Sequence, residues 1–519
     1  MQRGFFSSAA PLYHLDRLWY HPRFQMRYLD LGIIAAYLVA ITWFGARFRS
    51  SQKSLKDYFL GGKNTPWWAI SLSIVSAETS TLTIIGTPAL AFGGNLAFLQ
   101  LVMGYLLARL IIIGLFLPHY YRGELFTAYE LMKNRFGERV RKVTATIFLV
   151  TRALAEGVRV YAISIVVAIT LGAGEMPSII IILLLTLFYT FEGGMTAVIW
   201  TDVVQMFLYV AGAILSFYVI LNHIDGGFAH VWATAAAAGK LQVFDFQFAF
   251  SREFFSQPYT FVAGFLGGTF LTTATHGTEQ LMVQRLLAAR NEKESRLALL
   301  TSWGVIFFQF VLFLFIGIAL FVFYQDNGMA MPGVTDRDKI YPQFIWDNLP
   351  TGIAGIVMAA ILAAAMSNIS AALNSLASTT IIDFYRPFVR GRNAAQPDSP
   401  ESEKKSLGLA RYATVFWGAV LLAIALMARQ WGNVLEAGLT VASISVGALL
   451  GVFLLGILTK TVGQNGTVAG VIVGLSAVVF LKFGTNVAWT WYVIVGSLST
   501  FIVGSLVSPF VDRAPKGSE

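Results

Sequence analysis

Long apolar runs recur through most of the chain, with little polar sequence between them. A helix that crosses a bilayer needs about 20 mainly apolar residues, because its backbone groups must be satisfied within the segment. About thirteen runs fit this description. We therefore predict an all-α integral membrane protein with about 13 transmembrane helices, at residues 27–46, 67–92, 95–117, 143–170, 177–192, 196–222, 257–282, 297–325, 351–381, 407–428, 432–459, 463–483 and 486–508.

The few charged residues are divided unevenly among the loops between these runs. They make up 13% of the chain and leave a net charge of +9. Cytoplasmic loops are enriched in Lys and Arg, so this charge indicates topology rather than nucleic-acid binding. The loops with clustered positive charge, which we assign to the cytoplasm, contain residues 47–63, 122–142, 285–296 and 386–411.

This assignment orients the chain in the cell (inner) membrane. With an odd number of spans, the N-terminal tail, residues 1–26, lies outside and the C-terminus lies in the cytoplasm. The arginines of that tail, Arg3, Arg17 and Arg23, run mildly against the rule.

The residue types present exclude several kinds of chemistry. The chain has no cysteine, which rules out disulfides, thiolate metal sites, iron–sulfur clusters and cysteine nucleophiles. Its six histidines include no HExxH pair, and the sequence offers no nucleophile–base pair or metal triad. We therefore expect neither an enzyme nor an organic cofactor.

Residues 73–88, SIVSAETSTLTIIGTP, place hydroxyls and a carboxylate inside an apolar run. Ser76, Thr79 and Thr83 recur at helical spacing and share one face. A carboxylate near the bilayer midplane costs at least about 2.5 to 3.5 kcal/mol, so Glu78 must face protein, water or an ion. Small residues and a proline predict that this helix breaks or bends, at Gly86, Pro88, Gly93 and Gly94.

A second polar stripe lies in the run 351–381. Ser367, Ser370 and Asn374 fall on one helix face, and Asn368 falls on the neighbouring one. Such residues are ordinary packing contacts between membrane helices, but two dense clusters make that explanation less sufficient. Hydroxyl, amide and carbonyl oxygens suit a hard cation, and a membrane gradient makes sodium the useful one.

Two further carboxylates lie in or near the predicted helices. Asp202 either caps a helix start or faces an ion. Glu279 approaches the cytoplasmic end of its run beside His276, which is either a proton carrier or a hydrogen-bonding packing residue. The nearby Gln284 and Arg285 are typical of a paired or snorkelling cluster at a helix end.

Arg159 lies some turns inside the run 143–170, where a cation is unusual. It either pairs with Glu156, three residues earlier on the same helix, or grips a carboxylate of a substrate. Both alternatives stay open at this point.

Five segments together resemble the sodium/solute symporter family, which includes the bacterial proline, sialic acid and sodium/galactose transporters. They cover most of residues 50–475 in the family's order, and read KDYFLGGKNTPWWAISLSIVSAETSTLTIIGTPALAF, GGMTAVIWTDVVQ, TEQLMVQRLLAARN, AAAMSNISAALNSLASTTIIDFY and GALLGVFLLGILTKTVGQNGTVAG. The resemblance implies a LeuT-like core of ten helices in two inverted repeats, at residues 67–222 and 257–459. An additional helix and a cytoplasmic loop then occupy 27–66, and two more helices with a cytoplasmic tail occupy 460–519.

The resemblance also implies where ions bind. Transporters of this kind build their central site at breaks in the first helix of each repeat, here near Pro88 and near Gly264, Gly267 and Gly268. The shared sodium site of the family maps to the carbonyls of Ser76, Thr79 and Ala364 and the side chains of Ser367 and Asn368. Asn368 stands where relatives usually carry Ser or Thr.

Some relatives hold a second sodium ion between an aspartate that matches Asp202 and hydroxyls that include the match of Ser370. Ala371 stands where those relatives have a further hydroxyl. We therefore expect one sodium ion, with Asp202 as a coupling or gating carboxylate.

The resemblance implies a sodium-coupled symporter that imports a small organic solute by alternating access. Sugar transporters of the family use an acid on the second core helix, where this chain offers Gln100. This favours an organic anion or amino acid. The expected partners are a solute and the lipid bilayer, without nucleic acid, and we expect the protein to work as a monomer. A proton-coupled transporter and a solute sensor that acts through a partner protein are the alternatives. The candidate substrate residues are Glu78, Thr83, Gln100, Arg159, Tyr161, His276 and Glu279.

Overall fold

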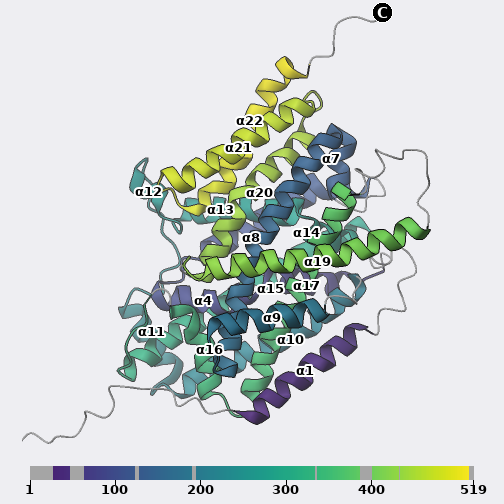
Figure 1. Cartoon of the computed structure of the whole chain (residues 1–519). Coiled ribbons are helices and arrows are strands. Elements are labelled where there is room, and N and C mark those ends of the chain that lie inside the picture. Colours follow the sequence, from purple (N-terminus) through teal and green to yellow (C-terminus); the bar gives the residue numbers. More distant parts are fainter. Residues whose placement is uncertain are drawn as a thin grey trace, which may run out of the picture.

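The computed structural model describes residues 27–46, 64–122, 128–189, 195–333, 336–385, 400–431 and 433–512. These parts of the chain are almost wholly helical, and they contain one isolated β-bridge, between Thr65 and Ala289. The prediction of an all-α protein is confirmed. Figure 1 shows helices α21 and α22 at one end of the molecule and α1 toward the opposite end.

The first half of the chain forms helices that match the predicted runs closely. They are α1 (Tyr28–Ala46), α3 (Trp67–Glu78), α4 (Thr81–Gly93), α5 (Leu99–Ile111), which continues through a π-turn into α6 (Leu117–Tyr121), then α7 (Ala128–Phe136), α8 (Glu138–Leu171), α9 (Glu175–Tyr189) and α10 (Met195–Asn222).

The second half of the chain is helical as well. Its helices are α11 (Gly227–Ala237), α12 (Arg252–Ser256), α13 (Phe261–Thr278), α14 (Gln280–Leu287), α15 (Glu292–Asp326), α16 (Arg337–Asn348), α17 (Ile353–Thr379), α19 (Pro400–Ala428), α20 (Val434–Leu458), α21 (Gln464–Gly484) and α22 (Tyr492–Val511).

Fewer of these helices are long and apolar enough to cross a bilayer than the predicted 13. Among the described residues, eight qualify by length and composition, or up to nine if the bent pair α3–α4 is one span. The helices α1, α9 and α19 contribute shorter apolar stretches.

Among the described residues, two apolar helices are broken, and the residues of the candidate site lie beside these breaks. The axes of α3 and α4 differ by 61° across Thr79 and Ser80. A second break separates α13 from α14 at Glu279, whose backbone is extended. Each break therefore interrupts a helix within an apolar run.

The predicted location of these breaks is wrong. Gly86 and Pro88 lie inside α4, and Gly264, Gly267 and Gly268 lie inside α13. The glycines instead allow close helix packing, because a Cβ atom on Gly268 would collide with the Leu101 carbonyl of α5. The pair Gly93–Gly94 does end α4.

Substituting Gly268 tests this packing role. Gly268→Ala is expected to lower the melting temperature of the purified protein, because overpacking a tight contact costs about 1–3 kcal/mol. Gly304→Ala is the matched control, since no atom lies within 4 Å of the added methyl group. Equal melting temperatures for both variants would argue against the close approach of α13 and α5.

The broken helices lie among the other long helices. α3 and α4 pack against α15, α13 packs against α5, and α8 packs against α17, α19 and α20. α21 and α22 pack on each other and on α20, and α1 packs on α17 and α10. The interior next to the two breaks is thus enclosed by helices from both halves of the chain.

Candidate functional site

The break between α3 and α4 exposes backbone carbonyls. In a continuous helix the Ser80 amide would bond to the Ser76 carbonyl, but it bonds to the Glu78 carbonyl at 3.2 Å. The Thr83 amide would likewise bond to the Thr79 carbonyl, but it bonds to the Ser80 carbonyl at 2.9 Å. Two carbonyl oxygens therefore lose their helical partners, and such oxygens are ligands that a hard cation prefers.

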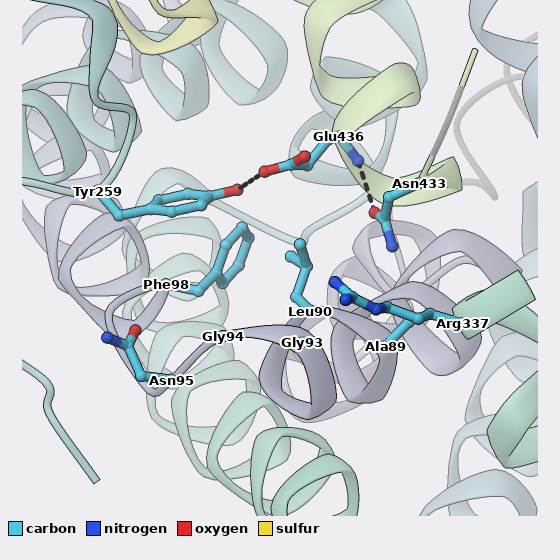
Figure 2. A pocket seen from close by; sticks show the side chains of 10 residues that line it. All are labelled: Ala89, Leu90, Gly93, Gly94, Asn95, Phe98, Tyr259, Arg337, Asn433 and Glu436. Carbon is cyan, nitrogen blue, oxygen red and sulfur yellow. Dashed lines mark hydrogen bonds between the residues drawn. The ribbon is translucent and has the colours of Figure 1, made fainter. Parts of the chain in front are cut away.

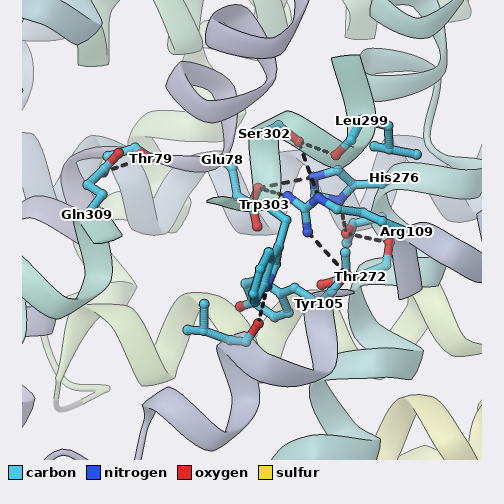
Figure 3. A network of polar contacts seen from close by, with 12 residues as sticks. Glu78, Thr79, Tyr105, Arg109, Thr272, His276, Leu299, Ser302, Trp303 and Gln309 are labelled. Atoms are coloured by element: carbon cyan, nitrogen blue, oxygen red, sulfur yellow. Dashed lines mark hydrogen bonds and ion pairs between the residues drawn. The ribbon is translucent and has the colours of Figure 1, made fainter. Parts of the chain in front are cut away.

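These two carbonyls belong to the residues that the sequence analysis assigned to sodium, Ser76 and Thr79. The Thr79 hydroxyl has another contact, since it accepts a hydrogen bond of 2.7 Å from Gln309 on α15 (Figure 3). On α17, Asn368 is buried. The side chains of Ala364 and Ser367, which complete the predicted set, lie outside the described part of the structure.

Asp202 lies in a buried cluster with an arginine. Ser73 on α3 donates a 2.7 Å hydrogen bond to the Asp202 carboxylate on α10, and the Arg285 guanidinium on α14 lies 3.0 Å from the same oxygen. Arg285 also donates to the Ser73 hydroxyl at 2.9 Å. Asp202 is thus neutralised by a cation of the protein itself, while Ser370, predicted beside it, is half-buried on α17.

Glu78 also has a buried cationic partner. Its carboxylate receives a 2.7 Å hydrogen bond from Arg109 on α5, and the His276 ring lies 3.3 Å from the same oxygen (Figure 3). Arg109 is fully buried and donates further to Ser302 and to the Tyr105 carbonyl. An ion pair therefore holds the end of α3 at the break.

The sequence analysis missed Arg109, although a signal was present. A cation in the predicted run 95–117 is as unusual as Arg159 in its own run, and the same cost of burying a charge applies to both.

The charged residues of α8 form a second ion-paired group. The Glu156 carboxylate pairs with Arg159 and lies 2.8 Å from Arg152, which in turn lies 3.9 Å from Glu279. Of the two alternatives for Arg159, the structure shows the ion pair with Glu156. Arg152 is a further buried arginine that the sequence analysis did not single out.

A central cavity of about 130 Å³ lies next to both breaks. Five of the predicted substrate residues line it, namely Glu78, Thr83, Arg159, His276 and Glu279. The other lining side chains include Ser80, Phe98, Tyr105, Thr151, Arg152, Thr272, Thr275, Phe310 and Leu439.

Two predicted substrate residues do not line the cavity. Tyr161 is buried elsewhere on α8. Gln100 is fully buried and donates to the Tyr259 carbonyl at 2.7 Å, while its side-chain oxygen accepts from the Asp245 amide at 3.1 Å. Gln100 therefore fastens the connection before α13 to α5.

The cavity wall offers guanidinium N–H groups that make no hydrogen bond to described residues. The Nε atoms of Arg152 and Arg159 are buried and have no hydrogen-bond partner among the described residues. A guanidinium presents several N–H donors in a plane, and these match the two oxygens of a carboxylate. The wall can therefore receive an anionic oxygen group.

Comparison with known proteins finds relatives that match most of the chain. A model of the sodium:solute symporter family matches residues 58–474. The sodium/sialic acid symporter SiaT of Proteus mirabilis is 30% identical over 93% of this chain and 95% of its own length. The human sodium/iodide cotransporter is 30% identical over 88% of this chain and 70% of its own length.

Solved structures show the same arrangement. The substrate-bound outward-open structure of a Na⁺-coupled sialic acid symporter has a TM-score of 0.80 and 30% identity, and it covers 94% of this chain and 98% of its own. A closed structure of the nucleobase-cation symporter Mhp1 has a TM-score of 0.53 at 11% identity, covering 88% of this chain and 96% of its own, which shows a shared fold.

Proposed function

Because this chain belongs to the sodium:solute symporter family, we propose that it carries a carboxylate-bearing organic anion, which binds in the central cavity. The protein is a multi-pass membrane transporter, a sodium-coupled symporter of a small organic solute, and not an enzyme. The observation that supports an anion is the pair of buried Nε donors of Arg152 and Arg159 at the cavity wall, which stay unused although both side chains also pair with Glu156.

The relatives give independent support for an anion. Their names state sialic acid, iodide and monocarboxylates as the transported solutes. All three are anions at neutral pH, and the guanidinium donors of Arg152 and Arg159 at this cavity suit an anion. Sialic acid is therefore the first solute to test.

Sodium is the coupling ion, and we place it at the break between α3 and α4. Its ligands would be the carbonyls of Ser76, Thr79 and Ala364 with the side chains of Ser367 and Asn368. The support is the loss of helical partners at the first two carbonyls, which a cation would satisfy. An ion here would tie the broken helix to α17, and inward opening would separate the two and release it.

One sodium ion per cycle is part of the proposal. Asp202, the carboxylate expected at a second cation site with Ser370, already binds Arg285 and Ser73. A second sodium ion would have to displace a buried guanidinium from it. We propose that Asp202 acts as a coupling or gating carboxylate between α3, α10 and α14.

For the topology we propose about 13 spans, a LeuT-like core of inverted repeats at 67–222 and 257–459, and a monomer in the inner membrane. The N-terminus would lie outside and the C-terminus in the cytoplasm. The support is that every predicted run folds as helix among the described residues, and that the first helix of each proposed repeat is broken.

Uptake into proteoliposomes tests the function. With an inward sodium gradient, we expect accumulation of N-acetylneuraminic acid, or of another carboxylate such as lactate, and no competition from galactose. Removing sodium should abolish the accumulation. Uptake of galactose alone, or uptake driven by a pH gradient in sodium-free buffer, would contradict the proposal.

A further inference from the structure

Exposed phenylalanines alternate with other residues in the segment that joins α11 to α13. The sequence is FDFQFAF at residues 244–250, and the exposed fractions are 43% for Phe244, 68% for Phe246, 62% for Phe248 and 87% for Phe250. Side chains of this kind are usually buried, and a group of exposed ones marks a surface that contacts a protein or a membrane. Residues 244–255 are called here the aromatic loop.

The aromatic loop is bonded to three helical elements through its backbone. The Asp245 amide donates to the Gln100 side chain on α5 at 3.1 Å. The Asp245 carbonyl accepts at 2.6 Å from the amide of Phe261, the first residue of α13. The Phe255 carbonyl accepts at 2.8 Å from the Ala488 amide, in the connection before α22. The loop is therefore fixed to α5, α13 and the start of α22, and Figure 1 shows its helix α12 beside the ends of α13 and α21.

The chain between the aromatic loop and α13 is bonded to the rest of the protein as well. Figure 2 shows the Tyr259 hydroxyl, which donates a 2.6 Å hydrogen bond to Glu436 at the start of α20. The Tyr259 ring also packs on Phe98, with centroids 5.7 Å apart. The phenyl rings are therefore exposed on a segment that is held at both ends.

Contacts between rings connect the aromatic loop to α13. Phe265 on α13 stacks on Phe261, with ring centroids 5.5 Å apart, and Phe261 packs on Phe246 at 5.1 Å. Phe246 stacks in turn on Phe244 at 5.3 Å. Phe261 and Phe265 are half-buried and lie one turn apart in the run 257–282, which we predict to cross the bilayer. The exposed rings thus continue the surface of this helix.

A second row of rings connects the aromatic loop to α22. Trp491, immediately before α22, packs on Phe255 at 5.1 Å, and Phe255 packs on Phe250 at 6.2 Å. Tryptophan is enriched where membrane helices meet the lipid headgroups. Residues 489–511 are apolar and long enough to cross a bilayer. Their exposed apolar face recurs every four residues, at Leu498, Ile502, Leu506 and Phe510. The aromatic loop therefore lies at the end of a lipid-facing helix.

This position favours lipid over a protein partner as the material that covers the rings, because the neighbouring helix faces are already covered by lipid. The backbone of a non-helical segment cannot enter the hydrocarbon, since its polar groups would lose their hydrogen bonds. Apolar side chains at a membrane surface reach about 5–10 Å into the boundary between headgroups and acyl chains. The charged residues at the far end of the loop, Arg252 and Glu253, are exposed and suit the aqueous side of that boundary.

We propose that the aromatic loop is a lipid-binding surface, which inserts the rings of Phe246, Phe248 and Phe250 among the headgroups and upper acyl chains. The leaflet is the one in which α22 begins, which is the outer leaflet in the proposed topology. Because Asp245 bonds to the first residue of α13, insertion holds the outer end of the second broken helix at the membrane surface. This inference goes beyond the proposed function and is independent of the solute.

The test measures how deep single residues lie in the membrane. The chain has no cysteine, so one introduced cysteine carries a nitroxide spin label without removal of native thiols. Phe248→Cys and Phe250→Cys are labelled and reconstituted into phosphatidylcholine liposomes. Power-saturation electron paramagnetic resonance then compares collisions with oxygen, which concentrates among acyl chains, and with a water-soluble nickel chelate. Both labels are expected about 5–10 Å below the lipid phosphates.

Glu253→Cys is the matched control, since Glu253 is exposed in the same loop and its label should lie in water. Ile502→Cys on α22 is the lipid reference. Labels at 248 and 250 that collide with nickel as often as the label at 253 would overturn the proposal. Low accessibility to both reagents, or spin–spin broadening between molecules, would show a protein or a second copy on the rings and would also overturn it. Phe250 is the most exposed of the four rings, so Phe250→Cys decides the question if Phe248→Cys does not fold.

Discussion

Replacing Arg109 by methionine is expected to abolish sodium-driven uptake and to reduce the yield of folded protein sharply. Glu78 would keep its charge next to the break of α3 and α4 but lose the 2.7 Å bond to its partner. Removing one partner of a buried ion pair costs about 3–5 kcal/mol, because the remaining charge stays desolvated. Uptake in proteoliposomes and the monodisperse fraction on size-exclusion chromatography measure the two effects.

A double variant separates folding from transport. Glu78→Gln combined with Arg109→Met removes both charges, so the folded fraction should recover toward that of the wild type. Arg296→Met is the control, because Arg296 pairs with Glu292 at the surface and its loss should cost little. Normal folding and uptake in the Arg109 single variant would show that the ion pair with Glu78 does not stabilise the break.

The second large effect is expected at the proposed sodium site. Ser367→Ala should raise the sodium concentration for half-maximal uptake by about tenfold, which corresponds to about 1.4 kcal/mol for one lost oxygen ligand. The affinity for solute at saturating sodium should change less. Sodium titrations of initial uptake rates measure both quantities.

Ser375→Ala provides the comparison on the same helix. The Ser375 hydroxyl donates to the Ala372 carbonyl of its own helix at 2.9 Å, so its removal should leave the sodium dependence unchanged. If both variants retain wild-type sodium dependence, the ion binds elsewhere and the proposed ligands on α17 are wrong.

The polar residues of the first broken helix show how far the sequence alone reaches. The cost of a carboxylate in lipid predicted that Glu78 must face protein, water or an ion, and in the structure it faces Arg109 and His276. Their identity could not be predicted, because they lie on α5 and α13, and no spacing along the chain relates them to Glu78.

The break itself was misplaced for a related reason. Gly86 and Pro88 are typical of helix bends, yet α4 passes through both, and the bend falls at Thr79 and Ser80. Gly86 instead admits Leu435 of α20, where any side chain would collide. A single sequence does not distinguish a glycine that permits close helix packing from a glycine that permits a helix to bend.

The sequence by itself determined the membrane class, the runs that become helices and the family, since hydropathy and helical spacing act within one segment. Only the tertiary structure decided which charges meet, so that Arg285 neutralises Asp202, Arg109 pairs with Glu78 and Gln100 anchors a loop. The physical reason is that a buried charge must find a partner, but its partner is chosen by contacts between helices far apart in the chain.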